Sequence, residues 1–223
     1  CGIAAFLVVC TVPILAKWAF IGRWKPGQIR LWSLAYVRFW FVKTLIRSNP
    51  CALLFVGSPL YSLYLRALGA KIGPGAVIFS RRIPVCTDLL TVGAGTVIRK
   101  ECFFQCYRAQ AGRIETGTVT LGRDCVVSER TVLDINTSMG DGAQLGHASA
   151  LLSDQAIPAG EHWHGSPAQR TDVDYLRVAP MACGKLRKVS FSAGTLLLAF
   201  LGYVPLAEGI PYLLASSSPT LRN

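Results

Sequence analysis

A six-residue repeat runs through the middle of this chain and leaves few folds open to it. Bulky apolar side chains recur at every sixth position: Leu121, Val127, Leu133, Met139, Leu145, Leu151 and Ile157. Small side chains stand four positions after each of the first five: Cys125, Thr131, Thr137, Ala143 and Ser149. An α-helix needs a period of about 3.6 residues and a simple strand a period of about two, so neither explains this spacing. The repeat predicts a parallel β-helix, in which one bulky side chain per short strand points inward and a small one fits each corner.

The repeat extends towards the N-terminus, but its phase changes twice. Three hexads make one coil of about 18 residues. The step from Ile72 to Val92 is 20 residues, and the step from Phe104 to Leu121 is 17 residues. Loops are therefore expected near residues 81–90 and 106–118.

The second interruption, residues 106–118, is the predicted functional loop. Gly112 and Gly117 free its backbone, while Arg108 and Arg113 offer contacts to an anion. We therefore expect this loop to contact an anionic ligand or cofactor.

Uncharged segments on either side of the repeat predict membrane spans. Residues 1–16 stop at Lys17 and Trp18, as a helix does at the bilayer interface. Residues 189–207 follow a basic cluster, and residues 210–216 are expected to begin a third span. A buried core helix is the alternative for the second segment. The composition, 52% apolar with a net charge of +11, favours lipid contact together with a basic surface.

Cationic side chains predict the topology of a multi-pass membrane protein. They follow the first span and precede the second, so the positive-inside tendency places the region between the spans in the cytoplasm. Residues 31–47 interleave five aromatic side chains with Arg38, Lys43 and Arg47, which suits a helix lying in the headgroup layer. Nucleic-acid binding is the alternative for a basic aromatic stretch, and the neighbouring span disfavours it.

These features divide the chain into four parts. They are the end of a transmembrane helix (1–22), interfacial amphipathic helices (23–69), the β-helix domain (70–170), and a transmembrane helix with the start of the next membrane segment (186–223). We expect the β-helix to dock on the cytoplasmic membrane face through residues 31–47. Because the chain begins without Met, we interpret it as an excerpt from a longer polypeptide.

The cysteines of the presumed cytoplasmic body are spaced irregularly, at Cys86, Cys102, Cys106 and Cys125. Reduced thiols that act as small apolar side chains are the preferred interpretation in that compartment. Cys102 and Cys106 lack the two-residue spacing of common zinc pairs, so no metal is expected there.

The hexads and their closing segment "IPAGEHWHGSPAQ" resemble the left-handed β-helix acyltransferases. The wider sequence is similar to the C-terminal half of membrane-bound nonribosomal peptide synthetases of the ε-poly-lysine synthetase type. The segments that carry this resemblance are "IGRWKPG" at 21–27, "GSPLYSLYLRALGAKIG" at 57–73, "MGDGAQLGHAS" at 139–149 and "WHGSPAQRT" at 163–171, with the span that follows.

The resemblance implies a mainly β fold, a left-handed parallel β-helix of hexapeptide repeats flanked by transmembrane and interfacial helices. It implies a module that catalyses or supports amide-bond formation between a carrier-bound aminoacyl thioester and an amine. The implied cofactor is the phosphopantetheine arm of a carrier domain, or CoA, without a metal. The implied partners are the carrier domain, sister β-helix repeats of the same parent chain, an amino-acid or amine substrate and the membrane, but no nucleic acid.

The predicted catalytic residue is His147. Transfer of an acyl group to an amine needs a base that deprotonates the nucleophile and donors that stabilise the oxyanion, and histidine suits the first task near neutral pH. His147 stands among small residues that leave its ring accessible, and Asp134 and Asn136 are expected to orient it. The alternatives are a surface imidazole for His147 and turn capping for the other two residues.

The other two histidines, His162 and His164, alternate along an extended run and are expected to face one side. A structural turn, contact with the carrier's pantetheine arm and a metal pair are the roles that remain open for them. The predicted cofactor-binding residues are His164, Gly165, Ser166, Pro167 and Ala168, together with Arg108 and Arg113 of the loop.

Three other functions stay open beside the amide-forming module. The chain could be a noncatalytic repeat that completes a pseudo-symmetric β-helix assembly, or a stand-alone CoA-dependent acetyltransferase. A γ-type carbonic anhydrase is the least favoured, because two of the three histidines lie in the closing turn and not on successive coils.

Overall fold

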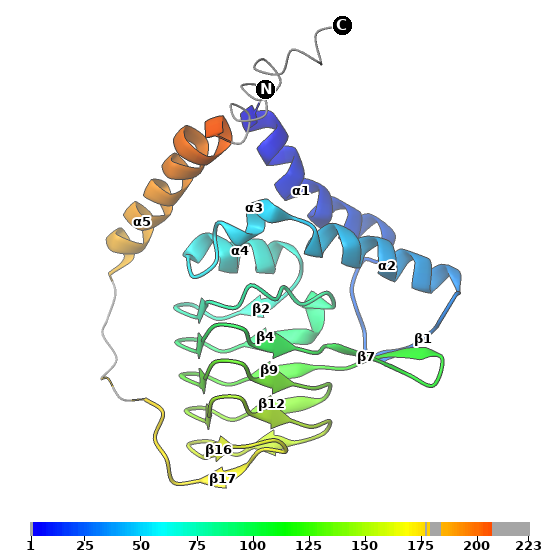
Figure 1. The fold of residues 1–223 in the computed structure, drawn as a ribbon, viewed down its shortest axis with the longest axis vertical. Coiled ribbons are helices and arrows are strands. Elements are labelled where there is room, and N and C mark those ends of the chain that lie inside the picture. The colour runs from blue at the N-terminus through cyan, green and yellow to red at the C-terminus, as the bar shows by residue number, and fades with distance from the viewer. Residues whose placement is uncertain (1, 177, 179–183, 207–223) are drawn as a thin grey trace, which may run out of the picture.

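The computed structural model describes residues 2–176, 178 and 184–206. Within this range the chain forms a β-helix with a layer of helices over one end and one further helix beside it (Figure 1). The third span predicted for residues 210–216 lies outside the described residues, as does residue 207 of the second.

Short parallel strands stack into the three faces of the β-helix. The first face holds β2 (Lys71–Ile72), β4 (Leu90–Val92), β9 (Val119–Leu121), β12 (Thr137–Met139) and β15 (Ala156–Ile157). The second holds β3 (Val77–Ile78), β5 (Val97–Ile98), β10 (Val126–Val127), β13 (Gln144–Leu145) and β16 (His162–His164). The third holds β6 (Phe103–Phe104), β11 (Val132–Leu133) and β14 (Ala150–Leu151). An antiparallel strand, β17 (Gln169–Thr171), covers β16 at the last coil.

The register confirms the predicted hexad repeat. Leu121 pairs with Met139, which pairs with Ile157, so residues 18 apart occupy the same place on successive coils. The bulky members of the repeat are buried, and so are the five small corner residues. Because each face contributes one inward side chain per coil, the repeat fills a narrow core, and this arrangement fits the predicted left-handed β-helix.

Both predicted interruptions of the repeat are present. The first contains a short 3₁₀ turn, η1 (Thr87–Leu89). The second is a hairpin of β7 (Tyr107–Gln110) and β8 (Arg113–Thr116), and β8 also pairs with β1 (Gly27–Arg30) to form a three-stranded antiparallel sheet. Residues 27–30 therefore form a strand inside the segment expected to be helical, because the hairpin offers them a free edge.

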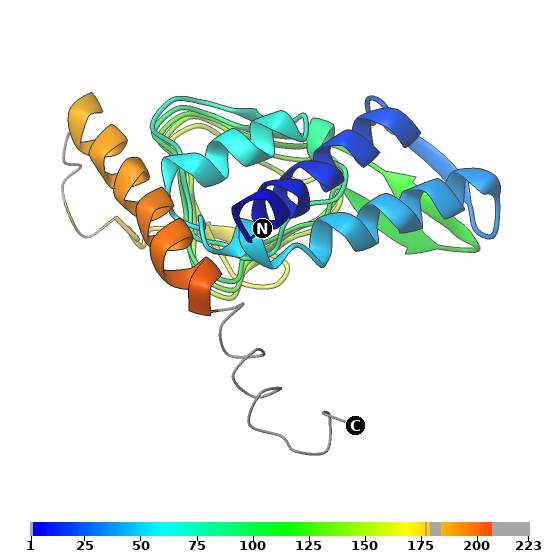
Figure 2. The same cartoon turned by 90° about the horizontal axis from the view of Figure 1, so that it is seen from above.

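The helical layer comprises α1 (Gly2–Phe20), α2 (Leu34–Arg47), α3 (Pro50–Leu53) and α4 (Pro59–Ala67), which lie across the end of the β-helix (Figure 2). The helix α2 begins at the cap residue Ser33, whose hydroxyl accepts a hydrogen bond from the Tyr36 amide. Its buried face consists of Phe39, Val42 and Ile46. The predicted headgroup helix thus also packs on the core of the domain.

The first helix, α1, ends at Phe20, inside the predicted segment 1–22. Lys17 and Trp18, expected at the bilayer interface, contact the rest of the domain. The Lys17 side chain is buried, and its Nζ lies 2.8 Å from Oδ2 of Asp88 in the first interruption of the β-helix. Trp18 donates a hydrogen bond from Nε1 to the Ala67 carbonyl. These contacts attach α1 to the domain, because a buried ammonium group needs a carboxylate partner.

The predicted second span corresponds to α5 (Lys185–Leu198) and the π-helical turn η2 (Ala199–Tyr203). Helical residues Lys185–Leu206 are long and apolar enough to cross a membrane, and they are the one such segment among the described residues. The apolar helix Ala4–Phe20 is shorter. The two helices approach each other where the Phe6 and Phe200 rings meet edge to face, with centroids 5.3 Å apart.

Candidate active site

His147 lies at the corner of the coil between β13 and β14. The next residue, Ala148, has a φ of 51° and turns the chain sharply. The same corner is occupied one coil earlier by Glu129, because the Ala148 amide donates a hydrogen bond of 2.9 Å to the Glu129 carbonyl. Nδ1 of His147 lies 2.8 Å from Oε2 of Glu129. The stacking of the coils therefore places a histidine and a carboxylate side by side.

Glu129 is held in its ionised form. Burial alone would raise the pKa of its carboxyl group, but a hydrogen bond from its own backbone amide and the charges of Arg99 and His147 lower it below its ordinary value. The Arg99 guanidinium lies 3.5 Å from Oε2 of Glu129. The contact of Nδ1 with this carboxylate lacks the geometry of a hydrogen bond, but the carboxylate is an ion-pair partner for a protonated imidazole.

Tyr175 closes one side of the corner. Its ring stacks on His164 at 6.0 Å and meets the edge of His147 at 5.9 Å. Gln144 holds this segment, because its Oε1 accepts a hydrogen bond of 2.7 Å from the Tyr175 amide. A Cβ at Gly146 would lie within 2.6 Å of the Tyr175 and His164 rings, so only glycine allows them to rest on the coil.

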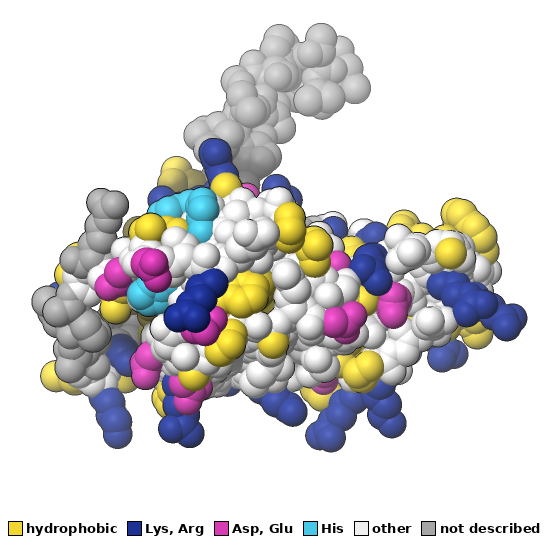
Figure 3. All heavy atoms as spheres, turned by 90° about the horizontal axis from the view of Figure 1, so that it is seen from below, with side chains coloured by type: hydrophobic (Ala, Val, Ile, Leu, Met, Phe, Trp, Pro, Cys, Tyr) yellow, Lys and Arg dark blue, Asp and Glu magenta, His cyan; other side chains and the backbone are white. Residues whose placement is uncertain are grey.

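A cavity of about 390 Å³ opens beside this corner. Its lining residues are Arg99, His147, Val173, Asp174, Tyr175, Leu176 and Val178. In the view from below, histidine and acidic side chains lie together over the last coils (Figure 3). The cavity combines a candidate base with a guanidinium and a phenol, both of which can donate hydrogen bonds to an oxyanion.

The closing turn lies next to the same corner. Nδ1 of His164 is 3.3 Å from Oγ of Ser149, and that hydroxyl also accepts a hydrogen bond from the Gly165 amide. Ala168 is buried, and its amide donates to the Ala150 carbonyl, whereas Ser166 and Pro167 are exposed. Hydrogen bonds therefore attach both ends of the turn to the preceding coil. Its tip, Ser166 and Pro167, is exposed to solvent.

The two residues predicted to orient His147 have other partners. Oδ2 of Asp134 accepts hydrogen bonds from Arg108 at 3.3 Å and Ser153 at 2.7 Å. Oδ1 of Asn136 accepts from the Thr118 amide at 3.3 Å. These contacts belong to other corners of the coil, and the carboxylate that contacts His147 is that of Glu129. The spacing could have revealed it, because Glu129 precedes His147 by one coil of 18 residues.

The two loop arginines also lie in contacts of their own. Arg108 is paired with Glu115 at 3.1 Å and with Asp134 at 3.3 Å, and these carboxylates offset its charge. Arg113 donates to Oε1 of Gln28 on β1 at 2.8 Å. The structure thus places both arginines in the hairpin sheet and not among the residues that line the His147 cavity.

The body cysteines are free thiols buried in the core: Cys86, Cys102, Cys106 and Cys125. Burial raises the pKa of each thiol, that of Cys106 to about 12. A thiol needs its thiolate form to act as a nucleophile, so these side chains are packing residues. Among the described residues, no three potential metal ligands lie together.

Comparisons with known proteins give a segment of a long synthetase and several solved acetyltransferase structures. No family model matches the chain. The chain is 31% identical over 187 residues to a Delta-poly-L-ornithine synthetase from Acinetobacter baumannii (strain AB307-0294). The aligned region spans 81% of this chain and 14% of that protein.

Among solved structures, the chain resembles galactoside acetyltransferase in complex with coenzyme A, with 10% identity and a TM-score of 0.49 over 72% of this chain and 92% of that one. It also resembles a hexapeptide-repeat-containing acetyltransferase from Vibrio cholerae, with 11% identity and a TM-score of 0.44 over 75% and 91% of the two chains. The curated relative is a poly-ornithine synthetase, so the ε-poly-lysine type stays a prediction. The chain is therefore similar to one segment of a much longer synthetase.

Proposed function

We propose that this chain is the acyltransferase-like module of a membrane-bound peptide synthetase, which joins a carrier-bound aminoacyl group to an amine. The observation that carries the proposal is the 2.8 Å contact between His147 and Glu129 at the mouth of a cavity. The similarity to a poly-ornithine synthetase supports the same reaction class. A histidine paired with a carboxylate can act as a general base towards an amine.

In this reaction the amine nitrogen forms a bond to the thioester carbonyl carbon, and the carbon–sulfur bond breaks. His147 takes the proton from the attacking amine at Nε2 and returns it to the departing sulfur. Glu129 stabilises the imidazolium that forms in between. Arg99 and the Tyr175 hydroxyl lie where they can donate to the carbonyl oxygen as it becomes an oxyanion.

The residues at the His147 corner fit the phosphopantetheine arm of a carrier domain. The cavity is open to solvent, and the exposed Ser166 and Pro167 form the tip of the adjoining turn. When bound, the arm supplies the acyl group as a thioester. His164 and the turn residues Gly165–Ala168 are the proposed contacts along it.

The proposed setting is the cytoplasmic face of a membrane in a multi-pass protein. Residues Lys185–Leu206 would cross the bilayer, and the exposed aromatic side chains of α2 would rest in the headgroup layer. The carrier domain and sister β-helix repeats are the proposed partners. The half-exposed His147 ring leaves one side of the site open to such a neighbour.

The experiment that tests this function replaces the orienting carboxylate. In the full-length synthetase, Glu129→Gln should lower kcat for transfer from the loaded carrier to the amine by about 10- to 100-fold and leave KM within about twofold. The physical reason is that a neutral amide no longer stabilises the imidazolium. Glu129→Asp should restore part of kcat, and the pH dependence of kcat should change in Glu129→Gln.

The matched control is Glu161→Gln, which removes a carboxylate that bonds Trp163 and Arg170 outside the cavity. Its transfer rate should equal that of the unmodified enzyme. Equal losses in both variants, or a loss of amino-acid activation in Glu129→Gln, would contradict a role in transfer.

A further inference from the structure

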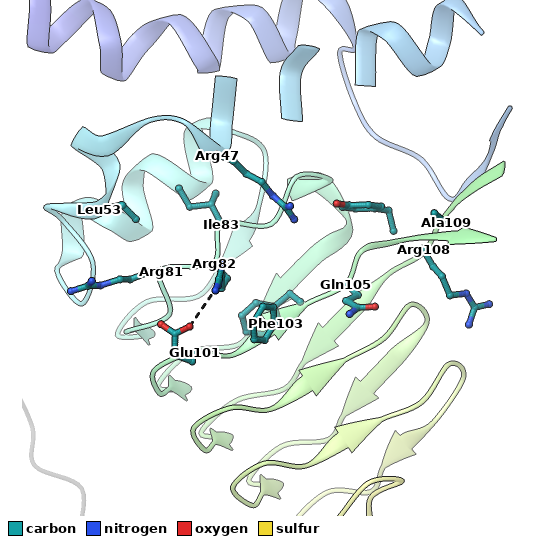
Figure 4. A pocket seen from close by; sticks show the side chains of 12 residues that line it. Arg47, Leu53, Arg81, Arg82, Ile83, Glu101, Phe103, Gln105, Arg108 and Ala109 are labelled. Carbon is teal, nitrogen blue, oxygen red and sulfur yellow. Dashed lines mark ion pairs between the residues drawn. The ribbon is translucent and has the colours of Figure 1, made fainter. Parts of the chain in front are cut away.

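A second and larger cavity lies between the helical layer and the third face of the β-helix. It encloses about 600 Å³ at the place where α2 and α3 end above β6 (Figure 4). Its lining residues are Arg47, Leu53, Arg81, Arg82, Ile83, Glu101, Phe103, Phe104, Gln105, Tyr107, Arg108 and Ala109. None of these residues lines the His147 cavity, and only Arg108 entered the sequence-based site prediction.

Two guanidinium groups of the cavity lining lie over aromatic rings. Arg47 reaches down from α2 to within 6.0 Å of the Tyr107 ring centre, and Arg82 lies 5.1 Å from that of Phe103. The side chains of Arg81 and Arg108 extend to either side (Figure 4). Aromatic rings hold arginine side chains in place without neutralising their charge.

Little negative charge opposes these two arginines. No carboxylate lies within ion-pair distance of Arg47 among the described residues. Arg82 has one partner, Glu101, at 3.6 Å, and both side chains are exposed to solvent. A solvent-exposed ion pair of this length contributes little free energy. Both guanidinium groups therefore remain able to bind an anionic ligand such as a phosphate.

Part of the cavity lining is apolar. Leu53, Ile83 and the rings of Phe103 and Phe104 contribute to it, and Phe103 lies below Arg47 and Arg82 in Figure 4. A ligand that fits would present an anion to the arginines and an apolar group to these side chains. Its size suits a small organic ligand and exceeds the needs of a single inorganic ion.

The cavity also lies at the end of the domain that carries the apolar helices. Arg47 is the last residue of α2, and the same helix exposes apolar side chains to solvent. These are Leu34, Val37, Trp40 and Phe41, preceded by Trp32. If α2 rests in the headgroup layer, Arg47 is within reach of lipid phosphates, which attract arginine at the cytoplasmic leaflet.

We infer that this cavity binds the phosphate-bearing headgroup of an anionic phospholipid, with Arg47 and Arg82 on the phosphate and the first acyl methylenes against Phe103 and Phe104. The inference rests on the proposed membrane setting and is independent of the reaction at His147. Such a site would fix the height and orientation of the β-helix on the membrane.

A photoactivatable phosphatidylglycerol with its reactive group in the headgroup tests this site in the full-length protein in vesicles. After irradiation, the tryptic peptide of residues 101–108 should carry the label, because it contains six of the lining residues. The matching phosphatidylcholine probe should label it weakly. Arg47→Gln combined with Arg82→Gln should reduce labelling by about 30-fold.

Two further variants separate a lost site from a lost fold. Arg123→Gln with Arg170→Gln removes the same charge from exposed positions on other coils and should keep labelling within about twofold of the unmodified protein. Glu101→Gln removes the one carboxylate from the lining and should raise labelling by about two- to fivefold. A gain of this kind cannot arise from unfolding.

Several outcomes overturn the inference. Equal labelling by the phosphatidylcholine probe, or unchanged labelling in the Arg47 and Arg82 double variant, excludes a headgroup site. Millimolar glycerol phosphate and unlabelled lipid are compared as competitors of the photolabel. If glycerol phosphate suppresses labelling as strongly as the lipid does, the cavity binds a soluble phosphate instead. Vesicle flotation reports membrane association separately, so failure of the membrane proposal is distinguishable from failure of this site.

Discussion

Replacing His147 by alanine in the full-length synthetase is expected to reduce peptide-bond formation by about 10²- to 10⁴-fold and to leave amino-acid activation and carrier loading intact. The reason is that the substitution removes the base at the cavity mouth while Glu129, Arg99 and the coils remain in place. Free amine becomes more abundant as pH rises, so part of the lost rate should return at higher pH. Single-turnover transfer from the preloaded carrier measures this step alone.

A structural imidazole would behave differently. His147 is half exposed, so its loss should barely change thermal stability if its role is in transfer. A lowered melting temperature with every step impaired would assign a structural role to the ring. Normal loading with unchanged product yield would favour a noncatalytic repeat, with the active counterpart elsewhere in the parent chain.

Leu133→Asp is expected to destabilise the β-helix strongly. Leu133 is fully buried and pairs with Phe104 above and Leu151 below, so the carboxylate would have no partner inside the coil. The cost is roughly 3–5 kcal/mol, which corresponds to a melting temperature lowered by about 10 °C or more. Scanning calorimetry of the full-length protein measures it.

The matched control is Gln110→Asp, which introduces the same charge at an exposed position of the β7–β8 hairpin. Its melting temperature should stay within about 2 °C of the unmodified protein. Equal shifts in both variants would mean that the hexad register is wrong.

The coils of this fold could be predicted because their determinants are local and repeated. Each inward residue of the repeat from Leu121 to Ile157 meets the side chain 18 positions away, and no distant segment alters that pairing. Both interruptions were visible as changes of phase. The position of Glu129 beside His147 follows from the same spacing.

Other features depend on contacts between segments far apart in the sequence. The strand β1 exists because residues 27–30 pair with β8 more than 80 residues later. Lys17 is buried because Asp88 lies opposite it, although its position after an apolar run suggested an interfacial anchor. Side-chain direction at a corner is equally hard to foresee. Asp134 turns to Arg108 and Ser153, which belong to the hairpin and the next coil.

Covalent capture by a reactive carrier arm reports directly whether His147 lies at the site of acyl transfer. A carrier domain whose arm ends in a bromoacetyl group can alkylate a nearby imidazole, which displaces bromide and forms a carbon–nitrogen bond. The tryptic peptide of residues 131–170 contains all three histidines, and fragmentation identifies the modified one. We expect alkylation of His147 in the full-length synthetase, at a lower rate in Glu129→Gln. Capture by a residue of another repeat, with His147 unmodified, would rule out His147 as the base of the transfer step.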